Sequence, residues 1–171
     1  MKILSLALLT TLACNSSQES LTTVKYVDLD KYAGKWYEIA SYPNSFQKGC
    51  HCSTAEYKYN PKGYIEVINT CRKNSVNGEI KSIKGKAFIV KDSNNAKLKV
   101  QFFWPFKGDY WIIGLADDYS YAIVGNPSRK YLWILSRTPV ISDETYSQIL
   151  EIIRSKGYDT DKIVKTAQKC N

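Results

Sequence analysis

The chain has 171 residues, a formal net charge of +8, 44% hydrophobic residues and 23% charged residues. This length supports one folded domain, and the composition excludes both a disordered chain and a bundle of membrane-spanning helices. Lysines recur at every second or third place in the strands of the middle of the chain, a pattern that fits a solvated outer face better than a dense nucleic-acid-binding stripe. An anionic membrane surface remains compatible with the positive charge.

The amino terminus has the organisation of an export signal. Met1 and Lys2 precede an apolar run of about a dozen residues, which is too short for a membrane span of about 20 residues. The small residue before Cys14 resembles the lipobox at which bacterial lipoproteins are cleaved and then acylated on the new amino-terminal cysteine. We predict a signal peptide over 1–13, lipidation of Cys14, a flexible tether over 14–25 and a folded domain over 26–171. A secretory peptide that is cleaved nearby without acylation is the alternative.

The number of cysteines also fits export. With Cys14 used for the anchor, an even number of cysteines is left, which suits two disulfides in an oxidising compartment. These cysteines are Cys50, Cys52, Cys71 and Cys170.

From residue 35 onward, segments rich in β-branched and aromatic residues alternate with turn residues. Short connections require antiparallel neighbours, because parallel pairing needs a crossover of about a dozen residues or more. Eight such strands most simply close into a barrel, since closure removes exposed edges, and a barrel of this size has room for one small ligand. The expected strands are 35–42, 52–59, 64–72, 80–90, 97–104, 109–116, 119–125 and 131–137.

The period of the sequence changes after the last of these strands. Ser142 is a suitable helix N-cap, and Tyr146, Ile149, Leu150 and Ile153 recur at the spacing of one helix face. Such a helix must cover an apolar surface, and the barrel wall is the surface available. The predicted fold is therefore all-β: an eight-stranded antiparallel up-and-down barrel with one C-terminal α-helix packed outside. A short strand and a tail are expected to follow the helix.

Three segments resemble the conserved blocks of the lipocalin family in order and spacing. The first, around Gly34 and Trp36, resembles the Gly-x-Trp signature; the second is 117–121, and the third, 135–139, contains Arg137. From about residue 26 to 170 the chain is similar to the bacterial outer-membrane members and to apolipoprotein D. The resemblance implies that Trp36 closes one end of the barrel and that Arg137 packs across it from outside.

The resemblance also implies a function that is not catalytic. We expect a lipoprotein of the bacterial outer membrane that holds a fatty acid or a lysophospholipid and uses no cofactor, because an aromatic, apolar interior suits an acyl chain. Pairing of two copies into a homodimer is left open. Strand alternation and the resemblance together give the candidate ligand-binding residues Trp133, Tyr110, Trp104, Phe106, Lys107, Val67, Asn69 and Tyr121.

The loop that contains three of these candidates has two interpretations. Lys107 is placed to pair with a carboxylate or phosphate headgroup, or else it is a solvated loop lysine. Trp104 and Phe106 either contact the ligand or pack within the loop itself.

The connectivity of the cysteines stays open at this point. The resemblance to apolipoprotein D and insect bilin-binding lipocalins implies a bond between Cys52 and Cys170, which leaves Cys50 with Cys71. Counting outward from the turn at 60–63 instead places Cys52 opposite Cys71.

Other function classes find less support in the sequence. His51 is the one histidine, so a Ser-His-Asp triad with a spare base is absent, and no Gly-x-Ser-x-Gly elbow occurs; these absences disfavour a lipid hydrolase. A metal held by Cys50, His51 and Cys52 is disfavoured because adjacent strand residues face opposite sides. A barrel that holds bilin or haem is the alternative carrier, although haem would need a tyrosine or cysteine ligand.

Overall fold

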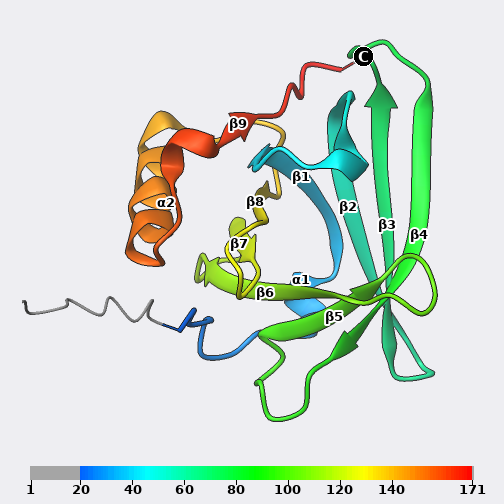
Figure 1. Cartoon of the computed structure of the whole chain (residues 1–171), viewed down its shortest axis with the longest axis vertical. Coiled ribbons are helices and arrows are strands. Elements are labelled where there is room, and N and C mark those ends of the chain that lie inside the picture. Colours follow the sequence, from blue (N-terminus) through cyan, green and yellow to red (C-terminus); the bar gives the residue numbers. More distant parts are fainter. Residues whose placement is uncertain (1–19, 171) are drawn as a thin grey trace, which may run out of the picture.

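The computed structural model describes residues 20–170, and within them the strands form one closed antiparallel barrel (Figure 1). Neighbours follow the order β2-β3-β4-β5-β6-β7-β8-β1-β9, and β1 also pairs with β2. The predicted eight-stranded barrel is confirmed, with one additional short strand at its C-terminal end. The strands are β1 (Gly34–Ser41), β2 (Cys50–Asn60), β3 (Tyr64–Lys73), β4 (Ile80–Ile89), β5 (Lys97–Gln101), β6 (Gly108–Leu115), β7 (Tyr121–Gly125), β8 (Leu132–Ser136) and β9 (Val164–Lys165).

The seam between β1 and β2 has two parts, one closed by direct pairing of the strands and one closed by the C-terminal segment. Residues 34–37 of β1 pair directly with β2. Beyond them the two strands separate and the C-terminal segment enters the gap, where the Thr166 N–H donates to the Ile39 carbonyl at 2.9 Å and the Cys52 N–H donates to the Ala167 carbonyl at 2.8 Å. The tail therefore supplies the hydrogen bonds that β1 and β2 no longer supply to each other.

Two disulfides hold the same end of the barrel. Cys50 is bonded to Cys71, and Cys52 is bonded to Cys170 at the end of the tail. This is the pairing that the family resemblance implies. The competing pair of Cys52 with Cys71 is wrong: the ladder pairs Asn60 with Tyr64 and Thr54 with Thr70, a register in which Cys52 is not opposite Cys71, and Cys52 itself lies in the bulge between His51 and Thr54.

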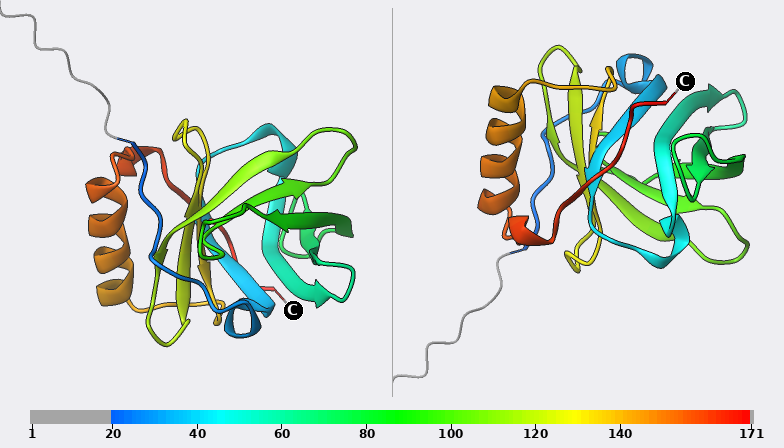
Figure 2. Two further views of the ribbon diagram at one scale, coloured as in Figure 1. Left: turned by 90° about the horizontal axis from the view of Figure 1, so that it is seen from below. Right: turned by 90° about the horizontal axis from the view of Figure 1, so that it is seen from above.

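A helix covers one outer face of the barrel, as predicted. The helix α2 (Asp143–Ser155) begins at Ser142, whose hydroxyl accepts a hydrogen bond from the Thr145 N–H at 3.1 Å. Ile149 and Ile153 are fully buried in an apolar cluster shared with the outward-facing side chains of β6, β7 and β8. Both views in Figure 2 show α2 lying along the outside of the strands.

The segment before the barrel differs from the sequence expectation. Residues 20–25, expected to belong to a flexible tether over 14–25, lie against the barrel: Leu21 is buried in the cluster beneath α2, and the Val24 N–H donates to a β6 carbonyl at 3.0 Å. Their apolar side chains explain the contact. The predicted signal peptide and Cys14 lie outside the described residues.

The outer cluster generates a test of the fold. Ile153→Ala is expected to lower the free energy of unfolding by about 2–5 kcal/mol, because the deletion leaves a cavity between helix and sheet. Ile152→Ala, at a neighbouring and only partly buried site, is expected to cost less than half as much. Urea unfolding followed by tryptophan fluorescence measures both values, and equal losses would contradict this packing.

Candidate functional site

One end of the barrel is sealed by an indole and a guanidinium. Trp36 is fully buried, and its Nε1 donates to the Tyr32 carbonyl at 2.8 Å. The guanidinium carbon of Arg137 lies 3.7 Å from the centroid of the Trp36 ring, and Nη1 donates to the Lys35 carbonyl at 2.9 Å. Gly34 has a φ of +88°, which favours glycine at the start of β1. The structure thus places Gly34, Trp36 and Arg137 in the arrangement that the resemblance implies.

A short helix that the sequence did not reveal completes this closed end. The helix α1 (Leu29–Tyr32) is a single turn, N-capped by Asp28, whose carboxylate accepts from the Asp30 N–H at 3.0 Å. It carries Tyr32 into the inner apolar cluster of the barrel. A single turn has too few residues for helical periodicity, so an Asp N-cap was its one available signal.

Three tyrosine hydroxyls meet above the sealed end. The Tyr110 hydroxyl lies 2.7 Å from that of Tyr32 and 2.8 Å from that of Tyr57. Burial raises the pKa of Tyr32 and Tyr110 well above 10 and raises the pKa of Tyr57 to about 12, since a buried phenolate lacks solvation. The hydroxyl cluster is therefore neutral at physiological pH.

The wall beside the tyrosines carries an unpaired polar atom. Val67 and Asn69 lie on the inner face of β3, opposite Gly85 and Ile83 of β4. The Oδ1 of Asn69 is buried and has no hydrogen-bond partner among residues 20–170. A buried amide oxygen without a partner is uncommon, so it is a candidate acceptor for a ligand donor.

The open end is formed around Trp133. Its ring stacks on Tyr131 with centroids 5.9 Å apart and an interplanar angle of 15°, and its centroid lies 6.4 Å from that of Phe46. The Trp133 Nε1 donates to Gln47 Oε1 at 2.8 Å. Gln47 belongs to a short 3-10 turn, η1 (Ser45–Gln47), which is N-capped by Asn44. The connection between β1 and β2 is thereby fixed beside Trp133.

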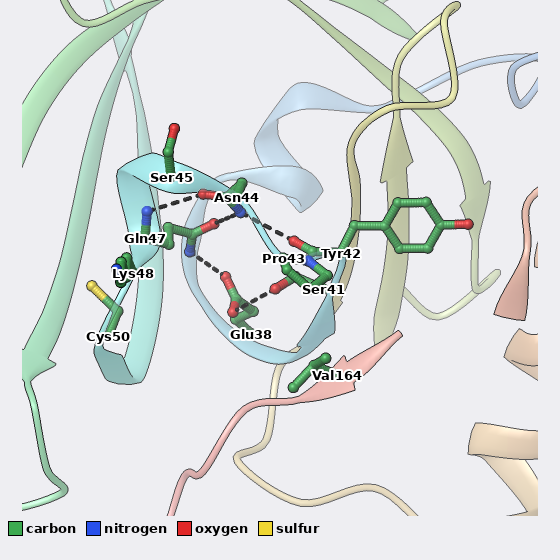
Figure 3. Close-up of a pocket in the computed structure, with 10 residues that line it drawn as sticks. All are labelled: Glu38, Ser41, Tyr42, Pro43, Asn44, Ser45, Gln47, Lys48, Cys50 and Val164. Carbon is green, nitrogen blue, oxygen red and sulfur yellow. Dashed lines mark hydrogen bonds between the residues drawn. The ribbon is translucent and has the colours of Figure 1, made fainter. Parts of the chain in front are cut away.

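A pocket of about 440 Å³ lies at this end, between β1, the connection to β2 and β9 (Figure 3). Its central group is Glu38, a side chain that is only 7% exposed. The carboxylate accepts hydrogen bonds from Gln47 Nε2 at 2.6 Å, Thr166 Oγ1 at 2.6 Å and Ser41 Oγ at 3.2 Å. The sequence prediction missed Glu38, although its place two residues after Trp36 on the same strand face was a signal for it.

Four of the predicted ligand residues belong neither to the inner cluster nor to the pocket lining. Trp104 is 86% exposed and Phe106 77% exposed, on the connection between β5 and β6. Lys107 lies with its Nζ 4.3 Å from the ring centroid of Phe88, which is on the outer face of β4. Tyr121 packs in the outer cluster beneath α2, because its neighbour on β7, Ala122, takes the inner face. The residues brought to the interior are Tyr110, Val67, Asn69 and Trp133.

Two further features of the described chain bear on the site. No helix within residues 20–170 is long and apolar enough to cross a membrane. Over the same range no group of three or more His, Cys, Asp and Glu side chains is arranged to hold a metal ion. Cys50 and Cys52, which flank His51, are both bonded in disulfides.

Comparison with known proteins identifies the family. A family model described as a lipocalin-like domain matches residues 27–168. Temperature-induced lipocalin-1 of Arabidopsis thaliana is 41% identical over 162 residues, which cover 90% of this chain and 86% of that protein. The outer membrane lipoprotein Blc of Escherichia coli K12 is 39% identical over 158 residues, which cover 91% of this chain and 89% of that protein.

A solved structure agrees with the sequence comparisons. Insecticyanin from the tobacco hornworm Manduca sexta superposes with a TM-score of 0.70 at 25% identity, covering 86% of this chain and 84% of that chain. Because the family model spans most of the chain and full-length relatives align with it, the chain belongs to the lipocalin family.

Proposed function

We propose that this lipocalin is a non-catalytic carrier of a single-chain lipid, a fatty acid or a lysophospholipid, held in the barrel with its headgroup at the open end. The observation that carries the proposal is the change of chemistry along the barrel. The closed end, with its three tyrosine hydroxyls, forms a neutral floor. Above this floor the walls are apolar, and a polar pocket with a buried carboxylate lies at the mouth, which is the open end of the barrel. This order of surfaces matches the order of groups in an amphiphile.

The lower part of the barrel favours hydrocarbon. Its inner cluster includes Ile65, Val67, Leu98 and Ile112, each at most 5% exposed. Transfer of a methylene group from water to such surroundings is worth about 0.8 kcal/mol, so affinity should rise with chain length. No lysine or arginine is among the buried residues of the range 20–170, so a lipid carboxylate has no buried cationic partner there.

The upper part supplies what a headgroup needs. The pocket volume of about 440 Å³ lies within the range of ligand sites in proteins. Trp133 contributes an apolar ring with a polar edge, which suits the boundary between chain and headgroup. Asn69 Oδ1 adds a free acceptor on the neighbouring wall.

We further propose that the protein is anchored in the outer membrane of a bacterial envelope through acylated Cys14. The lipobox-like sequence at Cys14 and the similarity to a bacterial outer membrane lipoprotein support this location. The similarity to a plant protein means that family membership alone does not imply an anchor, so the proposal rests on the Cys14 segment.

Lipid binding is tested on protein purified from its own host. Native mass spectrometry followed by lipid extraction is expected to recover one acyl lipid per chain. Persistent absorbance of visible light would instead favour a bound tetrapyrrole and would contradict the proposal.

The place of the site is tested by two tryptophan substitutions. Trp133→Ala is expected to weaken binding of a lysophospholipid about tenfold, because it removes the largest apolar group at the mouth. The matched control is Trp104→Ala, at a ring that is 86% exposed, and it should leave the affinity nearly unchanged. Calorimetric titration measures both, and an equal loss in the two variants would place the site elsewhere.

The neutrality of the floor is tested by alkaline titration. With a folded-state pKa of about 12 against 10 in the unfolded chain, Tyr57 contributes stability that is complete below pH 10 and is lost as the pH rises towards 12. The free energy of unfolding of Tyr57→Phe should therefore fall less steeply over this interval than that of the wild type. Identical slopes would show that Tyr57 is not shielded from ionisation.

The anchor is tested by cell fractionation. Cys14→Ser is expected to release the protein from membranes, because several acyl chains on one cysteine supply the attachment. Globomycin, which blocks lipoprotein processing, should leave an uncleaved precursor of the wild type. Retention of the Cys14→Ser variant in the membrane fraction would refute the anchor.

A further inference from the structure

Glu38 is a buried carboxylate without a cationic partner. It pairs with Leu135 of β8 in the ladder, and Leu135 belongs to the inner cluster, so the Glu38 side chain lies on the inner side of the barrel. Its three donors, Ser41, Gln47 and Thr166, are all neutral. None of the ion pairs formed within residues 20–170 includes Glu38. A buried charge of this kind is stabilised when an opposite charge joins it.

The surroundings of this carboxylate suit a cation with apolar substituents. Gln47 connects Glu38 to the aromatic group at the mouth, since its Nε2 donates to Glu38 while its Oε1 accepts from Trp133. The stacked rings of Trp133 and Tyr131, with Phe46 beside them, present aromatic surface at the same end. Aromatic faces attract organic ammonium ions, and the carboxylate that Gln47 connects to them supplies an opposite charge at the same end.

The same pocket also has a group for an anion. Lys48, on the connection from β1 to β2, lines the pocket with Glu38, and its side chain is exposed. A ligand group with one positive and one negative charge finds a partner for each in one pocket. A fatty acid, by contrast, would bring its carboxylate towards Glu38, and like charges at close range repel.

We infer that the mouth pocket is a headgroup subsite that binds the ammonium of a zwitterionic lysophospholipid against Glu38, with Lys48 facing the phosphate. This inference rests on the proposed lipid-carrier function and adds the class of headgroup to it. Glu38 then has a second role besides holding the C-terminal segment through Thr166.

The test compares lipids that share one acyl chain and differ in the headgroup. Lysophosphatidylcholine and lysophosphatidylethanolamine carry an ammonium, whereas lysophosphatidylglycerol and the free fatty acid do not. Calorimetric titration below the micelle concentration is expected to show that the wild type binds the two ammonium lipids about tenfold more tightly than the other two. Equal affinities of the wild type for all four would overturn the inference without any variant.

Two variants assign the preference to Glu38. Glu38→Gln keeps the size and a hydrogen-bond acceptor but removes the charge, and it is expected to lose the preference by weakening only the ammonium lipids. The matched control is Glu56→Gln, at an exposed glutamate on the outward face of β2, which should keep the wild-type preference. Circular dichroism of both variants verifies that the barrel is retained.

The remaining outcomes separate this inference from the proposed function. If Glu38→Gln weakens all four lipids by the same factor, Glu38 acts only as a support for the tail, and the headgroup subsite is refuted. If the wild type binds none of the lipids, the carrier function itself fails and the subsite fails with it. Binding of all four with a preference that survives in Glu38→Gln would assign the preference to another group and refute the role of Glu38.

Discussion

The double pairing of β1 is the constraint on which the rest of the structure depends. This strand hydrogen-bonds to β8 along one edge and to β2 along the other, so the antiparallel strands become a closed wall. The pairing with β2 covers only residues 34–37, and the C-terminal segment completes the seam from there to the mouth. The Cys52–Cys170 disulfide ties that segment in place. The same C-terminal segment therefore closes the barrel and forms part of the mouth, because it completes the seam and also brings Thr166 to Glu38.

The two ends of the barrel differ in the chemical groups that they bring to the interior. At the closed end, the buried Trp36 separates the Arg137 guanidinium from the interior, no lysine or arginine is buried within residues 20–170, and the buried tyrosines stay protonated. At the mouth, a buried carboxylate and an exposed lysine share one pocket. The buried charge of the described residues, Glu38, thus lies at the open end. A single-chain amphiphile has the same polarity along its length, which is why a carrier function follows from this order more directly than from any one residue.

The strands and the outer helix were predicted well from the sequence. Each of these elements buries one face, and that burial produces the alternation of apolar residues in the strands and their helical spacing in α2. Side-chain orientation was less predictable, because several strands are apolar on both faces. Tyr121 was expected inside, yet it packs beneath α2 while Ala122 faces the interior. Bulges between Glu38 and Ala40, and between His51 and Thr54, shift the register without a mark in the sequence. The support that the tail gives Glu38 joins residues 128 positions apart, a relation that local patterns do not contain.

The central claim is that a lipid lies inside the barrel with its headgroup at the mouth, and paramagnetic NMR tests it most directly. The indole N–H groups of Trp133 and Trp36 report on the mouth and the floor. A lysophospholipid spin-labelled near its headgroup should broaden the Trp133 signal, and one labelled near the end of its chain should broaden the Trp36 signal. Broadening confined to the exposed Trp104, with neither interior signal affected, would mean that lipid binds the surface and would contradict the account.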